Sequence, residues 1–137
     1  MSETHRFPTQ IYWEDTEATG IVCYANNLRF LERGRSDLVR RAGIDQAALL
    51  NSEGVMFPVR RCEIDYLQPA HLDDQIKVFT RIKKIGGASM DMDQDILRDE
   101  EPIVLAKVRL ACVGPGGRPQ RLPAFVRTAL NKLPVVN

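Results

Sequence analysis

The spacing of hydrophobic positions separates one long helix from a series of strands. The stretch from Phe7 to Trp13 is rich in β-branched and aromatic residues and predicts a first strand. From Leu28 the spacing becomes helical, and Gly43 stands where a left-handed residue would end the helix. The apolar positions of this helix are Leu28, Leu31, Leu38, Val39 and Ala42. The polar segment from Asp15 to Asn27 precedes it and offers Asn26 or Asn27 as the N-cap.

Four strand-like runs follow the long helix, after a shorter helix predicted from Asp45 to Asn51 with Asp45 as N-cap and Gly54 as its end. The runs are Val55 to Tyr66, Gln75 to Ile85, Ala88 to Leu97 and Pro102 to Val113. In the last run we expect Val104, Ala106, Val108, Leu110 and Cys112 to face a core, with Lys107 and Arg109 facing water. Residues 123–133 predict a terminal helix or tail.

This element order predicts a single α+β domain over residues 1–137. Either a strongly twisted sheet wraps the long helix or the elements form a flat α+β sandwich. In both architectures one copy leaves sheet edges unpaired, so we expect a homodimer or a larger assembly such as a homotetramer.

Composition excludes several classes of function. The chain has 137 residues, with 19 Lys and Arg against 18 Asp and Glu, so no general attraction to nucleic acid is expected. No apolar run approaches the roughly 20 residues that span a bilayer, so we expect a cytoplasmic protein without membrane insertion. Cys23, Cys62 and Cys112 have no paired spacing, which predicts buried thiols rather than disulfides or a zinc site.

Hydrolytic chemistry in this chain would depend on carboxylates. The only histidines are His5, in a terminus that looks mobile, and His71, which reads as a solvated turn residue. Glu14, Asp15 and Glu17 form an acidic segment that is either a solvated turn or a catalytic site. The nearby apolar residues 21–24 could desolvate a carboxylate and raise its pKa, and N–H groups of the loop and helix could polarise a carbonyl oxygen. Such parts suit acyl transfer to water.

Arg35 lies on the apolar stripe of the long helix, where its permanent charge needs a partner. We expect a snorkelling side chain or an ion pair across a dimer contact rather than a catalytic role, with Glu63 and Asp65 of the next strand as candidate partners.

The turn Gly86-Gly87-Ala88-Ser89 follows Lys83 and Lys84. It could hold a phosphate group through backbone N–H groups and lysine charge, or it could be a plain hairpin turn. Four aromatic residues fill either the core, an interface or an acyl pocket, and they are Trp13, Tyr24, Phe57 and Tyr66.

The segment from Tyr12 to Leu28, continued by Phe30 to Arg35, resembles the hotdog-fold thioesterases. It is most similar to the 4-hydroxybenzoyl-CoA thioesterase family, and within it to the Tol-Pal-associated acyl-CoA thioesterase branch. The resemblance continues through Glu63 to Tyr66, Pro69-Ala70, Asp73-Asp74 and Gly87 to Ser89. It implies a five-stranded antiparallel sheet around one long helix, dimers joined sheet to sheet, often paired as tetramers, and an acyl-CoA substrate with no metal or organic cofactor.

The resemblance also implies site residues. The family's active carboxylate is the Asp of an Asp-x-x-Gly arrangement, and in register with Gly20 that position is Glu17. Glu17 could act as base or nucleophile, Asp15 could substitute for it, or activity could be low with a different substrate. Tyr24 stands where a His or Tyr is frequent, and Asn26 matches the family Asn. A Tyr often follows that Asn, whereas this chain has Asn27.

The substrate would then extend from the helix entrance, beside Gly20 and Asn26, along the subunit interface toward Lys83, Lys84 and Ser89. One alternative is a non-catalytic acyl-CoA or acyl-carrier binding module of the same fold, favoured by the Glu at the Asp position. Another is hydration or dehydration of acyl thioesters, which usually needs a His paired with an acid.

Overall fold

The structure is a computed structural model, and it describes residues 4–133. Its strands are β1 (His5–Gln10), β2 (Val59–Tyr66), β3 (Gln75–Ile85), β4 (Ser89–Arg98) and β5 (Glu101–Ala111). Its helices are α1 (Asn27–Arg41), α2 (Gln46–Glu53) and α3 (Ala124–Asn131), with short 3-10 turns η1 (Trp13–Asp15), η2 (Tyr24–Asn26) and η3 (Pro115–Gly117).

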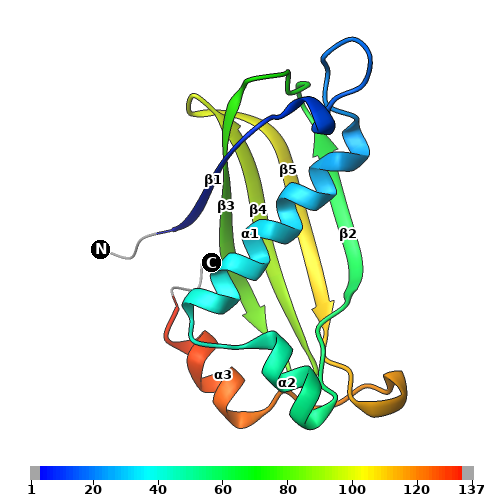
Figure 1. The fold of residues 1–137 in the computed structure, drawn as a ribbon. Helices are drawn as coiled ribbons and strands as arrows, with labels where there is room; N and C mark the ends of the chain where they lie inside the picture. Colours follow the sequence, from blue (N-terminus) through cyan, green and yellow to red (C-terminus); the bar gives the residue numbers. More distant parts are fainter. Residues whose placement is uncertain (1–3, 134–137) are drawn as a thin grey trace.

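The strands form one antiparallel sheet in the order β1-β3-β4-β5-β2, and α1 crosses one face of it (Figure 1). The predicted five-stranded sheet around one long helix is confirmed. The loops ahead of α1 lie at one end of the sheet, whereas α2 and α3 gather at the other (Figure 1). Among residues 4–133, no helix has the length and apolar character needed to cross a bilayer.

The core lies between α1 and the inner face of the sheet. All five predicted inward positions of β5 and the residue after it are buried, which confirms the alternation. Gly34 allows α1 to approach β3 closely, because a Cβ atom there would lie 2.7 Å from Val78 Cγ1. The helix packs mainly on β3 and β1. The inner face of the edge strand β2 is therefore poorly covered, and its residues are exposed except for half-buried Ile64.

The predicted boundaries of the helices hold closely. Gly43 has the left-handed φ of 91° expected after the end of α1. The Asp45 side chain accepts a hydrogen bond from the Ala48 N–H at 3.0 Å, and Gly54 ends α2 with a φ of 68°.

The amino-terminal region differs from prediction. The first strand begins at His5 and ends at Gln10, and Trp13 belongs to η1 instead. His5 is also not in a mobile terminus. Its side chain is largely buried against α1, with Nε2 lying 2.8 Å from Asp37 Oδ2. Arg41 Nε donates to the same carboxylate oxygen at 2.8 Å. The sequence around either residue does not predict this contact between β1 and α1, because 32 residues separate His5 from Asp37.

Candidate active site

The chain directly after Asp15 folds as a tight hairpin from Glu17 to Ile21, so Glu17 is the acid of the segment that lies in it. The Glu17 N–H donates to Ile21 O and the Gly20 N–H donates to Glu17 O, both at 2.9 Å. Gly20 has a φ of 78°, the left-handed conformation that closes a three-residue hairpin loop, where any other residue except Asn or Asp is disfavoured. Thr16 and Val22 pair directly below the loop. The spacing between the acid and Gly20 is thus a requirement of the turn.

A third segment anchors this hairpin. Val22 N–H donates to Ala70 O at 2.9 Å and Leu72 N–H donates to Gly20 O at 2.8 Å, so Ile21 pairs with His71. Since Ile21 also lies opposite Glu17 at the base of the hairpin, Glu17, Ile21 and His71 form one row across three extended segments joined by isolated bridges. His71 Nδ1 lies 3.7 Å from Asp74 Oδ2. Sequence reasoning treated His71 as an unrelated turn residue, because only the fold brings it beside the hairpin.

Glu14 and Glu17 are the acids of the segment whose side chains have no partner among residues 4–133, and of the two only Glu17 lies in the hairpin. Asp15 Oδ2 accepts a hydrogen bond from the Tyr12 N–H at 2.9 Å, which caps η1. The Glu17 side chain is exposed and makes no hydrogen bond or ion pair with residues 4–133. The predicted desolvation by residues 21–24 does not occur within one chain, since Ile21 and Tyr24 are themselves exposed.

The helix entrance is built differently from the predicted N-cap. Asn26 already has helical φ and ψ of −69° and −19°, because η2 runs directly into α1. Its side-chain Nδ2 instead donates to Asp15 O at 2.9 Å and ties the acidic segment to the helix. Asn27 Nδ2 donates to Tyr24 O at 3.2 Å, while the buried Asn27 Oδ1 has no partner among residues 4–133. No side chain caps α1, and the Asn26 and Asn27 N–H groups donate to the Cys23 and Tyr24 carbonyls, whereas the Tyr24 N–H has no acceptor within η2.

Aromatic side chains surround the hairpin, and most are not in the core. Tyr24 and Tyr66 make an edge-to-face contact with ring centroids 5.5 Å apart. Their exposed fractions are 69% and 42%, and that of Trp13 is 64%. Only Phe57 packs partly against the core. Core filling was therefore the wrong prediction for Trp13, Tyr24 and Tyr66, and an interface or substrate pocket is left open for them.

Arg35 does not pair with Glu63 or Asp65. Those two residues point to the outer sheet face, since they are opposite Lys107 and Leu105 in the β2–β5 register. Arg35 lies under the inner face, where its Nη1 donates to Gln94 Oε1 at 2.9 Å. Gln94 in turn donates to Leu31 O and Thr80 Oγ1. A buried amide gives no charge signal in a sequence, which is why this partner was missed.

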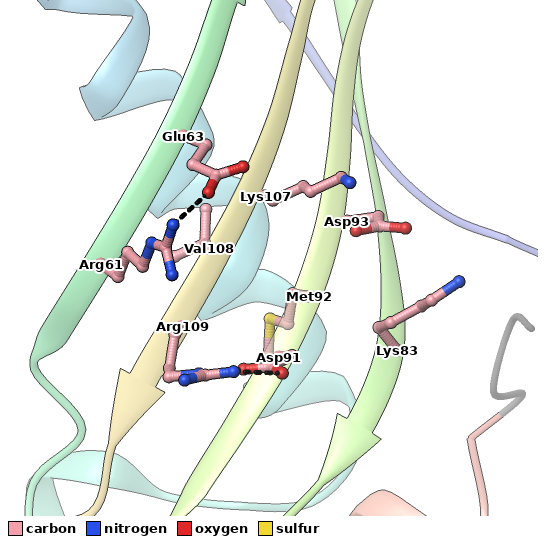
Figure 2. A pocket seen from close by; sticks show the side chains of 9 residues that line it. All are labelled: Arg61, Glu63, Lys83, Asp91, Met92, Asp93, Lys107, Val108 and Arg109. Atoms are coloured by element: carbon pink, nitrogen blue, oxygen red, sulfur yellow. Dashed lines mark hydrogen bonds and ion pairs between the residues drawn. The ribbon is translucent and has the colours of Figure 1, made fainter.

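The predicted phosphate-binding turn is a hairpin between β3 and β4, in which the Gly86 N–H donates to Ser89 O at 2.8 Å. A bulge between Ile82 and Lys84 leaves both Lys83 and Lys84 exposed. Lys83 lines a shallow cavity of about 250 Å³ on the outer sheet face, beside Lys107 and the Arg109–Asp91 ion pair (Figure 2). The hydrogen bonds from Arg109 hold the pKa of the Asp91 carboxyl below its usual value.

The β3–β4 turn with Lys83 and Lys84, which we call the cationic turn, is far from the Glu17 hairpin of the same chain. The hairpin lies near the start of β3, and Lys83 follows eight residues after Gln75, roughly 27 Å along the strand at about 3.4 Å per residue. One chain therefore does not bring Lys83, Lys84 and Ser89 together with Glu17.

Metal and cysteine sites are not indicated. No cluster of three or more His, Cys, Asp or Glu side chains within the described part of the chain could hold a metal ion. All three cysteines are free. Cys112 is buried as predicted, whereas Cys62 is exposed on the inner face of β2 and Cys23 is half-buried.

The fold and the carboxylate hairpin ahead of its helix define the class as hotdog-fold thioesterases. The family described as the Thioesterase-like superfamily matches residues 11–130, and the chain belongs to it.

Similar proteins carry related names. The acyl-CoA thioesterase YbgC of Haemophilus influenzae is 35% identical over 128 residues, covering 93% of this chain and 94% of that protein. The acyl-CoA thioester hydrolase YbgC of Escherichia coli O157:H7 is 37% identical over 123 residues, covering 88% and 91%. The crystal structure of a probable thioesterase from Bartonella henselae matches with a TM-score of 0.84 at 38% identity, covering 88% and 100%.

Proposed function

We propose that this protein hydrolyses acyl-CoA thioesters to the free acid and CoA, with Glu17 as the catalytic carboxylate. The observation that carries the proposal is the free Glu17 side chain at the base of a rigid hairpin, directly ahead of the uncapped amino end of α1. The relatives named for acyl-CoA hydrolysis support the same reaction.

The reaction requires a nucleophile and a site for negative charge. In one route Glu17 removes a proton from a water molecule while that water attacks the thioester carbonyl carbon. In the other route the Glu17 carboxylate attacks the carbonyl carbon directly and forms an anhydride, which water then cleaves. In both routes the carbon–sulfur bond breaks and the sulfur leaves as CoA thiolate, which takes up a proton. The carbonyl oxygen becomes negative in between and is stabilised by the Tyr24 N–H, which has no acceptor within η2, and by the positive end of α1.

Gly20 and Asn26 shape this site. Gly20 closes the hairpin that presents Glu17, and its carbonyl is fixed by Leu72. Asn26 was predicted to bind substrate, but its amide is engaged by Asp15 O, so we assign it the positioning of the acidic segment against the helix.

A second copy completes the site in this proposal. Antiparallel pairing of β2 with the β2 of another chain would extend the sheet across an unpaired edge. It would also bring the partner's β3–β4 turn to the end of the sheet that carries the Glu17 hairpin. Lys83, Lys84 and Ser89 of one chain would then receive the CoA phosphates of a substrate hydrolysed in the other.

The assembly is thus a homodimer, and two such dimers would give a homotetramer. We place it in the cytoplasm, where acyl-CoA is the available substrate and free cysteines persist in reduced form. The proposal includes no metal or organic cofactor, because carboxylate and backbone N–H groups supply the chemistry.

The test is release of free thiol from short-chain, long-chain and aromatic acyl-CoA esters, measured for the native protein and for Glu17→Gln. Turnover of at least one class by the native protein, lost in the variant, is expected. Glu at the usual Asp position favours one competing function, a non-catalytic acyl-CoA or acyl-carrier binding module. Tight binding of acyl-CoA without turnover of any ester would establish that function instead.

A further inference from the structure

Arg35 is a buried cation without a counter-ion. Its exposed fraction is 8%, and its one hydrogen bond goes to the neutral amide of Gln94. No carboxylate among residues 4–133 forms an ion pair with it. Burial lowers the pKa of the guanidinium from its usual value, with Glu32 opposing that effect from a distance. Because burying an unpaired charge is costly, such an arrangement calls for an anion that is not part of the fold.

The free part of the guanidinium faces a cavity. Only Nη1 is bonded, and the remaining Arg35 nitrogens are not among the buried polar atoms that lack a partner. Arg35 lines a cavity of about 170 Å³ between α1, the start of α2 and the start of β2. Its lining includes the apolar side chains of Val39, Phe57 and Leu110 and the charged side chains of Glu32 and Arg35. A cavity with apolar walls on one side and a buried cation on the other suits a chain that ends in an anionic group.

Exposed side chains on α1 and on the inner face of β2 lie between this cavity and the Glu17 site, and we call this path the trough. On α1, Leu28, Glu32 and Arg35 follow one another at helical spacing and share one side of the helix. On the inner face of β2, exposed Tyr66 and Cys62 run in the opposite direction, from the aromatic contact with Tyr24 toward the start of the strand. The trough therefore starts at the candidate active site and ends at the Arg35 cavity.

Helix geometry sets the length of the trough. Arg35 lies eight residues after Asn27, so it is roughly 12 Å farther along α1 than the helix entrance. A methylene chain built from bonds of about 1.5 Å needs on the order of eight to ten carbons to cover that distance. We propose that Arg35 is an anion subsite at the distal end of the acyl-binding trough, selecting acyl thioesters whose chains carry a second carboxylate at the end remote from the thioester.

A ligand carboxylate fits the subsite better than the one nearby acid of the chain. Glu32 is exposed, three residues before Arg35, and does not reach within ion-pair distance of it. A carboxylate arriving through the trough can accept from the two nitrogens that Gln94 leaves free, and a charge-assisted pair of this kind is stronger than a neutral one. The inference that the ligand is an acyl thioester rests on the proposed thioesterase function. The inference that an anion binds at Arg35 rests only on the cavity.

The experiment compares matched pairs of CoA thioesters of six to twelve carbons, each with and without a terminal carboxylate. We expect the native protein to favour the carboxylated member at least tenfold in kcat/KM near eight to ten carbons. Arg35→Met should remove that preference while hydrolysis of the uncharged member persists. Arg33→Met, at an exposed arginine of the same helix, is the matched control and should retain the preference. Equal kcat/KM for both members in the native protein, or identical ratios in the two variants, would overturn the proposal.

A binding measurement separates this inference from the hydrolytic function. Octanedioate and octanediamide, which has the same chain without the charges, are titrated by calorimetry into the native protein, into Arg35→Met and into Arg35→Lys, which is the second variant if Arg35→Met does not fold. Tighter binding of the dicarboxylate, weakened in either variant, supports the subsite even when no thioester is hydrolysed. Equal affinity for octanedioate and octanediamide in the native protein refutes it, whatever the turnover.

Discussion

Replacing Glu17 by Gln and Asp15 by Asn separates the two acids of the hairpin region by their chemistry. Both changes remove one negative charge with little change in shape. In the structure, Glu17 makes no contact that stabilises the fold, whereas Asp15 caps η1 through the Tyr12 N–H. The first variant should therefore lose activity and keep stability, and the second should do the reverse.

The magnitudes follow from these roles. Loss of a general base or nucleophile lowers kcat by about 10²- to 10⁴-fold, which corresponds to roughly 3–5 kcal/mol in the activation free energy. An exposed side chain without partners changes the unfolding free energy by no more than about 0.5 kcal/mol. In Asp15→Asn the new amide oxygen can still accept from the Tyr12 N–H, but as a neutral acceptor, so this variant should lose about 1 kcal/mol of stability and change kcat by less than about threefold.

The assay is steady-state thiol release with the best acyl-CoA ester, run beside thermal unfolding of each variant. Two results would refute the reasoning. One is a large loss of kcat in Asp15→Asn with Glu17→Gln nearly fully active, which would move the catalytic role to Asp15. The other is an equal loss of kcat and melting temperature in Glu17→Gln, which would make Glu17 structural.

Three further predictions concern Gly20 in the Glu17 hairpin, Lys83 and Lys84 at the cationic turn, and the dependence of stability on pH. Gly20→Ala should lower the free energy of unfolding by about 1–2 kcal/mol and also lower kcat, because Gly20 has a left-handed φ and not because a Cβ atom would clash. Gly20→Asn should recover part of the stability and part of kcat. Equal losses in the Ala and Asn variants, in unfolding and turnover assays, would contradict this. Changing Lys83 and Lys84 together to Gln should raise KM for acyl-CoA roughly tenfold with kcat kept, while Lys77→Gln should not; an unchanged KM would disprove the phosphate site. Burial alone would raise the pKa of Asp37, but hydrogen bonds from β1 and α1 hold it below its usual value, so its stabilisation is present above about pH 4 and is lost as pH falls through the lower folded value. Melting curves from pH 6 to 2 should then be flatter for Asp37→Asn, and parallel curves would exclude that contribution.

Elements whose information is local could be predicted from the sequence. Gly43, Asp45 and Gly54 mark helix ends because the backbone conformation or hydrogen bond they supply belongs to the residues beside them. The alternation of β5 is equally local, since one face of a strand packs on the core. The register between Glu17 and Gly20 works for the same reason, as it describes a single turn.

Features that depend on long-range pairing could not be predicted in this way. His71 reaches the hairpin only because its segment pairs with Ile21, and nothing near His71 in the sequence signals that pairing. Acidic partners were predicted for Arg35 because a buried cation usually pairs with a carboxylate, whereas in the fold its hydrogen-bond partner is the neutral amide of Gln94. The sequence left core, interface and acyl pocket open for the aromatic residues, and the fold decides against the core for Tyr66 because α1 packs toward β1 and β3.

The hairpin around Glu17 is closed by main-chain hydrogen bonds and by the conformation of Gly20, and the side chain at position 17 takes no part in holding it. Selection can therefore change that side chain without disturbing the fold. Lineages of such proteins are free to exchange Asp for Glu, to adjust the reach of the reactive oxygens, or to abandon hydrolysis and keep a ligand-binding scaffold. The same independence makes position 17 a site where an engineer can install other reactive groups and measure chemistry separately from stability.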